Sequence, residues 1–256
     1  MTSAVFGPEY PKINTIFNRT GRGIIIPDEY STLEIEYLAN SPWNWTEKVD
    51  GTNIRLYWNG GHVTVGGRTN GESGSQLEAG LVDYIYNIAG VADRATWQKA
   101  FPDCDDVTLY GEGFGRGIRS GGQYLDHIEF ILFDVRIGEW WLRDDDIRDV
   151  AEKMDCQVVP KWGTMSVVEA WEVTKSGVMK SHWPGAQIEG LVGRPAVDFY
   201  SRKGERVVAK TKVRDWADYQ KEQAKLLADA DLEAKRAEKK AAGKARYEAM
   251  KEARDG

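Results

Sequence analysis

The chain has 256 residues, with 34 Lys and Arg against 40 Asp and Glu and a net charge of −6, so nonspecific electrostatic adhesion to nucleic acid should be modest. Ten tryptophans and an aromatic content of 11% predict a globular protein with ample material for a core. The two cysteines and three histidines are scattered, which argues against a disulfide framework and against a zinc site.

The sequence shows no sign of a targeting or membrane segment. Met1 to Thr20 lacks the basic start, apolar stretch and small-residue cleavage site of a signal peptide. The longest strongly apolar run, Ile128 to Val135, is far too short to span a bilayer. We therefore expect a soluble, cytoplasmic protein without a membrane partner.

The first predicted strands surround a lysine in the segment Glu47-Lys48-Val49-Asp50-Gly51-Thr52-Asn53. Trp43 to Thr46 is strand-like, and Asn53 to Trp58 alternates apolar and polar residues before an Asn-Gly-Gly turn and a returning strand at 62–65. We expect a meander of strands from Trp43 to Gly67. Lys48 then lies where a strand ends and a loop begins.

Lys48 is a candidate nucleophile. A free lysine has a pKa of about 10.4, so a nucleophilic lysine needs burial or nearby cations that favour the neutral amine. Lys210 and Lys212 alternate with period two, so they point to one face of a strand and could supply those cations and bind a nucleotide phosphate. By itself, the short Lys-x-Asp-Gly motif is more typical of a charged residue before a turn than of a nucleophile.

The remaining segments mix helices and strands without regular βαβ alternation, which predicts an α+β fold with largely antiparallel sheets. Gly113 to Gly122 is expected to be a flexible basic loop, in which Arg116 or Arg119 either contacts polynucleotide phosphate or belongs to a solvated connection. Helices are expected at 75–89, 144–154 and 167–174, and strands at 107–110, 128–136, 187–192 and 206–212.

The composition changes after Trp216. Residues 217–256 contain ten Lys or Arg and nine Asp or Glu, many alanines and few large apolar side chains. This pattern predicts a charged helical tail that buries little on its own. We therefore divide the chain into a domain at residues 1–216 and a tail at residues 217–256.

Several motifs follow the lysine in a fixed order, and together they resemble motifs I, III, IIIa, IV and V of the covalent nucleotidyltransferase superfamily of polynucleotide ligases and mRNA capping enzymes. Their central residues are Lys48, Arg68, Glu112, Phe133 with Asp134, Glu189, and Lys210 with Lys212. The resemblance runs from about Glu47 to Lys212, and five motifs in order are much more specific than one. Glu-Lys-x-x-Gly-Thr-Asn, which ends at Asn53, is similar to the RNA ligase 2 form.

The sequence departs from that family at three places. Asp50 stands where the family usually has histidine, and Arg194 stands where it often has lysine, which keeps the charge but changes the geometry. Motif III reads Gly-Glu-Gly-Phe-Gly around Glu112, which is richer in glycine than expected and makes the local loop shape uncertain.

The resemblance implies an ATP-grasp-like nucleotidyltransferase (ligase adenylation) domain with flanking helices and a short C-terminal helical tail. It implies an ATP-dependent RNA ligase that forms lysyl-AMP, transfers AMP to an RNA 5′-phosphate and seals it to a 3′-hydroxyl, using Mg²⁺ or Mn²⁺. The implied roles are catalysis by Lys48, Lys210 and Lys212, nucleotide binding by Glu47, Asn53, Arg68, Glu112, Phe133 and Glu189, and metal binding by Glu189 and Asp50. Glu112 would contact the ribose, and Phe133 would stack on adenine.

Two other interpretations remain open. A minimal DNA ligase would share the motifs, although DNA ligases and capping enzymes usually add an OB domain and no strand-rich stretch of that size follows Lys212. A nucleotide- or nucleic-acid-binding module without ligase activity would keep the fold, but its signature would be loss of Lys48 or of the Lys210 and Lys212 pair. Neither is lost.

Overall fold

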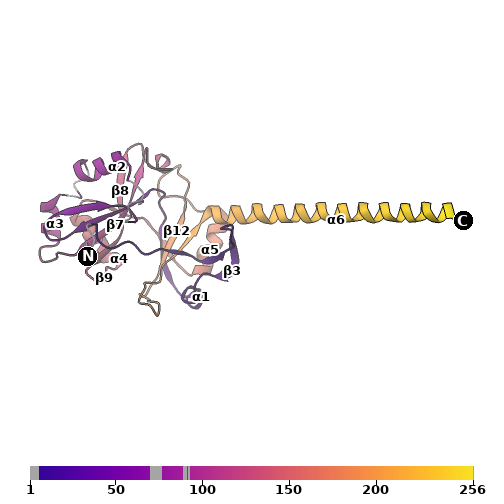
Figure 1. Ribbon diagram of the computed structural model, residues 1–256. Helices are drawn as coiled ribbons and strands as arrows, with labels where there is room; N and C mark the ends of the chain where they lie inside the picture. Colours follow the sequence, from indigo (N-terminus) through magenta and orange to yellow (C-terminus); the bar gives the residue numbers. More distant parts are fainter. Residues whose placement is uncertain (1–5, 70–76, 89–90, 92, 256) are drawn as a thin grey trace, which may run out of the picture. The chain divides into compact units, whose positions relative to one another are not determined.

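The computed structural model describes residues 6–69, 77–88, 91 and 93–255, and the chain divides into two units. Unit 1 is Met1–Ile16 with Tyr30–Val213, and unit 2 is Phe17–Glu29 with Arg214–Gly256. Across the described ranges, no helix is both long and apolar enough to cross a membrane. Figure 1 shows the elements of both units in sequence colours.

Five strands of unit 1 form a sheet that is antiparallel except between its first two members. In spatial order they are β1 (Asn14–Thr15), β13 (Ala209–Lys212), β12 (Gly190–Pro195), β4 (Trp43–Glu47) and β11 (Lys161–Met165). Trp43 and Trp45 on β4 are fully buried and stack on each other, while Asn44 and Thr46 between and beyond them are only partly covered. This alternation fixes which face of β4 is core.

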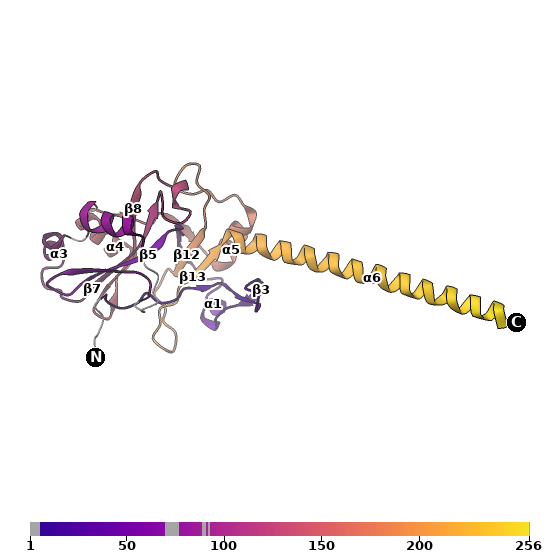
Figure 2. The same cartoon turned by 45° about the horizontal axis from the view of Figure 1, so that its top comes forward.

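The second large sheet of unit 1 has six strands, and Figure 2 shows β5, β7 and β8 lying side by side. Neighbouring strands are antiparallel except for β10 and β8. In spatial order they are β10 (Gln157–Val158), β8 (Ile128–Ile137), β7 (Val107–Gly115), β5 (Thr52–Trp58) and β6 (Val63–Gly66), with β9 (Trp140–Trp141) also paired to β8. The predicted α+β class with largely antiparallel sheets is confirmed.

Helices cover the six-stranded sheet and complete its core. Leu81, Ile85, Trp97 and Ile147 come from four different helical segments and form one buried cluster with apolar residues of β5, β7 and β8. The helical segments of unit 1 are α1 (Leu33–Tyr37), α2 (Ala79–Asp83), the π-helix η1 (Tyr84–Ile88), α3 (Arg94–Ala100), the 3₁₀ helix η2 (Gly121–Gln123), α4 (Asp144–Lys153) and α5 (Val167–Ser176). The helix predicted at 75–89 is confirmed at 79–88, and its first and last residues lie outside the described ones.

The expected meander from Trp43 to Gly67 is wrong. β5 and β6 form the predicted hairpin, but β4 belongs to the other sheet, so the loop after Lys48 crosses from one sheet to the other. The crossing brings Gly51 against β7, where an added Cβ would lie 2.3 Å from the carbonyl oxygen of Gly113. Only glycine allows this close approach of two backbones.

The expected flexible loop at 113–122 is also wrong. β7 continues to Gly115, η2 begins at Gly121, and Ile118 between them is buried. The glycine-rich motif III is thus part of strand β7. Its Gly113 leaves room for the packed side chain of Leu81, since an added Cβ would lie 2.5 Å from it. Two further strands begin later than expected, β12 at Gly190 and β13 at Ala209.

Unit 2 consists of the two-stranded sheet of β2 (Phe17–Arg19) and β3 (Ile25–Tyr30) and most of α6 (Val213–Asp255). Arg19 forms an ion pair with the buried carboxylate of Asp215, and Arg22 pairs with Glu222 over 2.8 Å. These contacts hold the first turns of α6 to the small sheet. The predicted C-terminal helix is confirmed, and it is a single uninterrupted helix (Figure 1).

Candidate active site

Lys48 lies at the first position after β4, as its sequence context predicts. Its backbone N–H donates to the carbonyl oxygen of Gly190 over 3.0 Å, which continues the pairing of β4 with β12. Its Nζ lies 2.6 Å from Oε2 of Glu189, and both side chains are largely buried. Gly190 of β12 therefore holds the backbone of Lys48, and Glu189, the residue before β12, holds its side chain.

Glu189 joins Lys48 to the lysine pair of β13. Lys212 Nζ lies 2.6 Å from Oε1 of Glu189, so the two carboxylate oxygens bind two different ammonium groups. Burial acts to raise the pKa of Glu189, but the charges and hydrogen bonds of Lys48 and Lys212 outweigh it and lower that pKa. The carboxylate is held ionised between two cations.

Lys210 is part of the same cluster. It alternates with buried neighbours on β13, so the prediction that Lys210 and Lys212 share one face is confirmed. Burial, and then the charges of Lys212, Lys48 and Arg68, lower the pKa of Lys210 to about 8. Arg68, an exposed residue just after β6, is thus close enough to act electrostatically on the lysines.

Asn53 and Glu112 face the cluster from the six-stranded sheet, where they are directly opposite each other on β5 and β7. Burial raises the pKa of Glu112 to about 7, Lys48 opposes this rise, and the charge of Glu189 adds to it. Asn53 Oδ1 is buried without a hydrogen-bond partner. A buried polar atom without a partner is costly, so Asn53 is suited to a ligand that donates a hydrogen bond.

The acidic residues on either side of Lys48, Glu47 and Asp50, are held by two segments from elsewhere in the chain. Buried Glu47 accepts hydrogen bonds from Ser181 Oγ at 2.6 Å and from the His182 backbone N–H at 2.7 Å. The Asp50 backbone N–H donates to Tyr124 Oη at 3.3 Å. The backbone is therefore anchored on both sides of Lys48.

The segment Ser181–Trp183, which we call the strap, also packs against Tyr124. The Trp183 ring lies edge to face with Tyr124, with 5.2 Å between ring centroids, and it packs on Phe114 in the same way. Ser181, Tyr124 and Trp183 were not predicted as site residues. They carry no motif in the sequence, and only the fold brings them to Lys48.

Phe133 lies on β8 and is only partly buried, unlike a core phenylalanine. Its ring packs edge to face with Tyr10, with 5.1 Å between ring centroids, and it also lines a small hollow with Thr46, Val158 and Arg194. An exposed aromatic face beside a hollow is compatible with stacking on a flat ligand. The ring lies on the same sheet as Glu112, one strand away.

Arg194 is not part of the lysine cluster. One of its terminal nitrogens donates to the carbonyl oxygen of Phe133 at 2.6 Å, and its guanidinium lies 3.5 Å from both Asp134 and Asp144. The fully buried Asp134 also pairs with Arg206 and accepts from Tyr10 Oη at 2.8 Å. Arg194 and Asp134 thus act in a buried structural network beneath Phe133.

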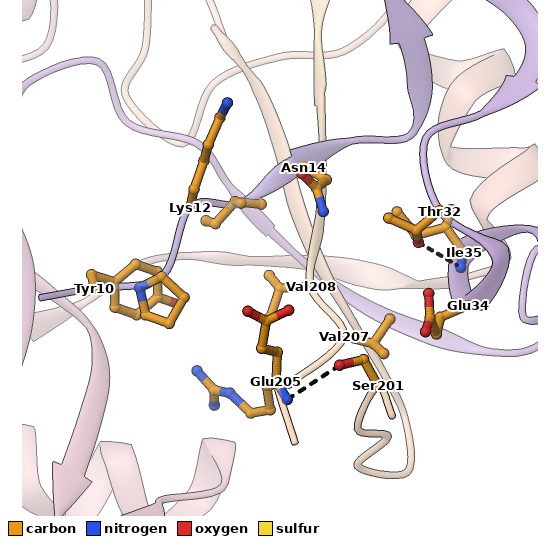
Figure 3. A pocket seen from close by; sticks show the side chains of 13 residues that line it. Tyr10, Lys12, Asn14, Thr32, Glu34, Ile35, Ser201, Glu205, Val207 and Val208 are labelled. Carbon is orange, nitrogen blue, oxygen red and sulfur yellow. Dashed lines mark hydrogen bonds between the residues drawn. The ribbon is translucent and has the colours of Figure 1, made fainter. Parts of the chain in front are cut away.

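A second hollow of about 350 Å³ is lined by residues 10–14, 32–35 and 201–208 (Figure 3). Lys12, Glu34 and Glu205 bring charges of both signs to it, and Ser201 Oγ accepts a hydrogen bond from the Glu205 backbone N–H. It contains none of the predicted site residues. The mixed charge gives it no clear preference for an anion or a cation.

Within the described ranges, no three His, Cys, Asp or Glu side chains are grouped so that they could hold a metal ion by themselves. Asp50 and Glu189 both act on Tyr124, whose pKa burial and the nearby carboxylates raise to about 12. Two carboxylates near one phenol fit the way Mg²⁺ binds, through one or two carboxylates with substrate phosphates and water. Both oxygens of Glu189 are bound to lysine ammonium groups, so Asp50 and Glu189 are not arranged as a metal site by themselves.

Three comparisons place this fold and sequence among known proteins. Two variants of Naegleria gruberi RNA ligase in the apo state match with TM-scores of 0.52 and 0.54 at 18% and 16% identity, each over 83% of this chain and over 59% and 64% of the ligase. A variant of that ligase with ATP and Mn matches with a TM-score of 0.53 at 18% identity, over 83% of this chain and 59% of the ligase. At these identities the likeness shows the fold alone.

The chain spans less than two thirds of the length of these ligases. A search of curated proteins gave no match. A family model described as RNA ligase matches residues 41–212, a range that begins before Lys48 and ends at Lys212. With most of its length matched, the chain belongs to the RNA ligase family.

Proposed function

We propose that this protein is an ATP-dependent RNA ligase that joins RNA 3′-hydroxyl and 5′-phosphate ends through a lysyl-AMP intermediate on Lys48. One observation carries the proposal: Lys48 and Lys212 share the carboxylate of Glu189 at 2.6 Å each. Lys210 lies in the same cluster. A nucleophilic amine surrounded by fixed cations is what attack on a phosphate requires, because phosphoryl transfer depends mainly on charge stabilisation.

In the first step, the Lys48 ammonium gives one proton to Oε2 of Glu189, to which it is already hydrogen-bonded, because only the neutral amine has a lone pair for the attack. Nζ then attacks the α-phosphorus of ATP, the N–P bond forms, and the bond from that phosphorus to the pyrophosphate oxygen breaks. The nitrogen loses its basicity as the N–P bond forms, so a second proton leaves it for solvent. Lys210 and Lys212 offset the negative charge on the α-phosphate and the departing pyrophosphate.

The second and third steps use the same cations. An oxygen of the RNA 5′-phosphate attacks the phosphorus of lysyl-AMP, the N–P bond breaks, and Lys48 regains a proton. The RNA 3′-hydroxyl then attacks the activated 5′-phosphate, loses its proton to solvent and releases AMP. Arg68 is suited to the 5′-phosphate because a guanidinium binds phosphate with two parallel hydrogen bonds.

The nucleotide would be held by residues of both sheets. Asn53 and Glu112 would face the hydroxyl groups of the nucleotide, and Phe133 would stack on the adenine. Glu47 would orient the adenine by exchanging its hydrogen bond with Ser181 for one with the nucleotide. A divalent cation, Mg²⁺ or Mn²⁺, would be held by Glu189 and Asp50 together with the phosphates and would supply additional positive charge.

The test is covalent labelling with ATP that carries the label on its α-phosphate, in the presence of Mg²⁺ and then of Mn²⁺. We expect label on the denatured protein and none on Lys48→Ala. Lys153→Ala is the matched control, because Lys153 is an exposed lysine on α4 whose ion pair with Asp149 lies on that helix. Labelled Lys48→Ala protein would contradict the proposed nucleophile.

The second part of the test identifies the substrate. The labelled protein is chased with a 5′-phosphorylated nicked RNA duplex or with the DNA duplex of the same sequence. The proposed function is supported if the RNA duplex removes the label from the protein and is sealed, and the DNA duplex does neither. Sealing of DNA in preference to RNA would replace it with a DNA ligase, and covalent label that no polynucleotide removes would contradict strand joining.

A further inference from the structure

The charge of α6 is divided along the helix, although its total is close to neutral. Residues 214–234 contain three basic and six acidic side chains, whereas residues 235–246 contain six basic side chains and one acid, Glu238. All six basic side chains in this stretch are exposed. The near-neutral composition of the tail thus conceals a strongly basic segment.

The basic residues of this segment also share one side of the helix. Arg236, Lys240 and Lys244 follow one another at intervals of four, and Lys235 and Lys239 form a second row beside them. The opposite side is made of small residues, Ala234, Ala237, Ala241 and Ala245, together with the one acid, Glu238. We call Lys235, Arg236, Lys239, Lys240, Lys244 and Arg246 the α6 basic face.

A solvated helix surface usually has opposite charges at intervals of four, since such pairs stabilise the helix. Lys235 pairs in this way with Asp231 over 2.7 Å. Within residues 235–246, the charged pairs at this interval are Lys235 with Lys239, Arg236 with Lys240, and Lys240 with Lys244, which are like charges and disfavour the helix. Glu238, three residues after Lys235, and Glu248, four residues after Lys244, offset them only in part along the sequence. The basic face therefore has a local cost that an anionic partner would remove.

The other side of the segment indicates which anion. A helix that lies on a lipid surface needs large apolar side chains opposite its charges, and alanines provide little apolar area for insertion. A polynucleotide needs only the charges, because most of its contacts with proteins are made to phosphates. The segment rises about 16 Å from its first to its last residue, enough to meet several successive phosphates.

We propose that the α6 basic face binds the phosphate backbone of RNA without regard to base sequence, an inference that rests on the ligase function proposed above. It adds a polynucleotide contact that is separate from the lysine cluster of unit 1. The face increases affinity for the RNA and takes no part in the reaction of Lys48 with ATP.

The test compares two double variants that remove the same charge from the same helix. Lys239→Ala/Lys240→Ala alters the basic face, and Lys221→Ala/Lys225→Ala alters the acidic first half of α6. Alanine favours helix, and circular dichroism checks that helix content is unchanged. Binding to a labelled nicked RNA duplex is measured between about 50 and 200 mM KCl, and ATP labelling is measured on each variant.

We expect the basic-face variant to bind RNA about tenfold more weakly and to lower the slope of log affinity against log salt by about 2, because each lost phosphate contact removes about one unit. The control and Lys239→Arg/Lys240→Arg, which keeps the charges, should bind as the wild type does. ATP labelling should be equal in all four proteins.

Equal RNA binding by the two alanine variants would overturn the inference, since only net charge would then matter. Tighter binding to anionic lipid vesicles than to RNA would overturn it in favour of a membrane surface. Failure of ATP labelling in the wild type would instead contradict the proposed ligase reaction, and the RNA affinities would still decide whether the basic face binds polynucleotide.

Discussion

Burial, with the nearby charge of Glu189, raises the pKa of Glu112 to about 7, above the ordinary value of 4.5. The folded state therefore disfavours the ionised carboxylate. The contribution of Glu112 to the free energy of unfolding is therefore fully present below pH 4.5 and is lost as the pH rises through about 7. Glu112 is thus a group that the fold holds at a cost, as is common for side chains that bind ligands.

This cost predicts a pH-dependent gain in stability for Glu112→Gln. Gln cannot ionise, so the free energy of unfolding of the variant relative to the wild type should increase by on the order of 2 kcal/mol between pH 5 and pH 8. Urea unfolding at both pH values measures it. Glu152→Gln on the exposed side of α4 should show no such change, and a pH-independent difference for Glu112→Gln would contradict the buried titration.

Lys210 leads to a prediction about proton uptake. Its pKa of about 8, lowered by burial and the neighbouring cations, means that part of the protein has a neutral Lys210 at pH 8.5. A bound phosphate favours the ammonium form, so ATP binding should take up a fraction of a proton per site.

Isothermal titration calorimetry in two buffers of different ionisation enthalpy measures that uptake at pH 8.5 and at pH 6.5. Uptake by the wild type should be greater at pH 8.5 than at pH 6.5, where Lys210 is already protonated and Glu112, with a pKa of about 7, can also exchange a proton. Lys210→Arg should lose the uptake at pH 8.5, because arginine keeps its charge. Equal uptake at pH 8.5 by this variant would assign the proton to another group.

At the scale of elements, the strap gives the next prediction. Ser181→Ala removes one of two hydrogen bonds to the buried carboxylate of Glu47, next to Lys48, and Tyr124→Phe removes the acceptor for the Asp50 N–H. We expect each to lower the free energy of unfolding by about 1–3 kcal/mol and to slow lysine adenylylation more than it weakens ATP binding.

Single-turnover labelling over a range of ATP concentrations separates the rate of adenylylation from the affinity for ATP. Ser176→Ala, at the end of α5, is the matched control and should keep the wild-type rate. If Ser181→Ala and Tyr124→Phe lose stability but keep the rate of adenylylation, the strap and Tyr124 support the fold without positioning Lys48.

The elements also show why the sequence predicts some of the site and not all of it. Alternation predicts the strand that ends just before Lys48 and the strand that carries Lys210 and Lys212, because a buried face repeats every second residue. It does not say which strands pair. β4 and β5 are separated by four residues yet lie in different sheets, a crossing that depends on the contact between Gly51 and β7.

Contacts between distant segments explain the residues that were missed. Ser181 and Glu47 are 134 positions apart, and Tyr10 and Asp134 are 124 apart, so no local pattern relates them. Arg194 was noted only as a substitute for lysine, and its contacts with Asp134, Asp144 and Phe133 depend on tertiary packing. Motif order identifies the residues of the lysine cluster, while their supports require the fold.

At the scale of the whole molecule, the proposed division between residues 1–216 and 217–256 predicts that the two parts have separable roles. Lys48, Glu189, Lys210 and Lys212 all belong to unit 1, and residues 235–246 of α6 are exposed throughout. Exposed residues contribute little to burial of apolar surface. The distal part of α6 should therefore be dispensable for folding and for reaction with ATP.

A chain that ends at Ala234 tests this division. It keeps the ion pairs of Arg19 and Arg22 with the first turns of α6 and loses the whole basic face. We expect a change in Tm within about 2 °C, equivalent to less than about 1 kcal/mol in a protein of this size, and wild-type labelling by ATP. A loss of labelling would show that adenylylation needs the distal helix. Normal labelling, together with sealing that reaches its maximal rate only at a higher RNA concentration, would place the contribution of α6 in RNA binding. The reaction of Lys48 with ATP would then be intact, and only the affinity for RNA would be lower.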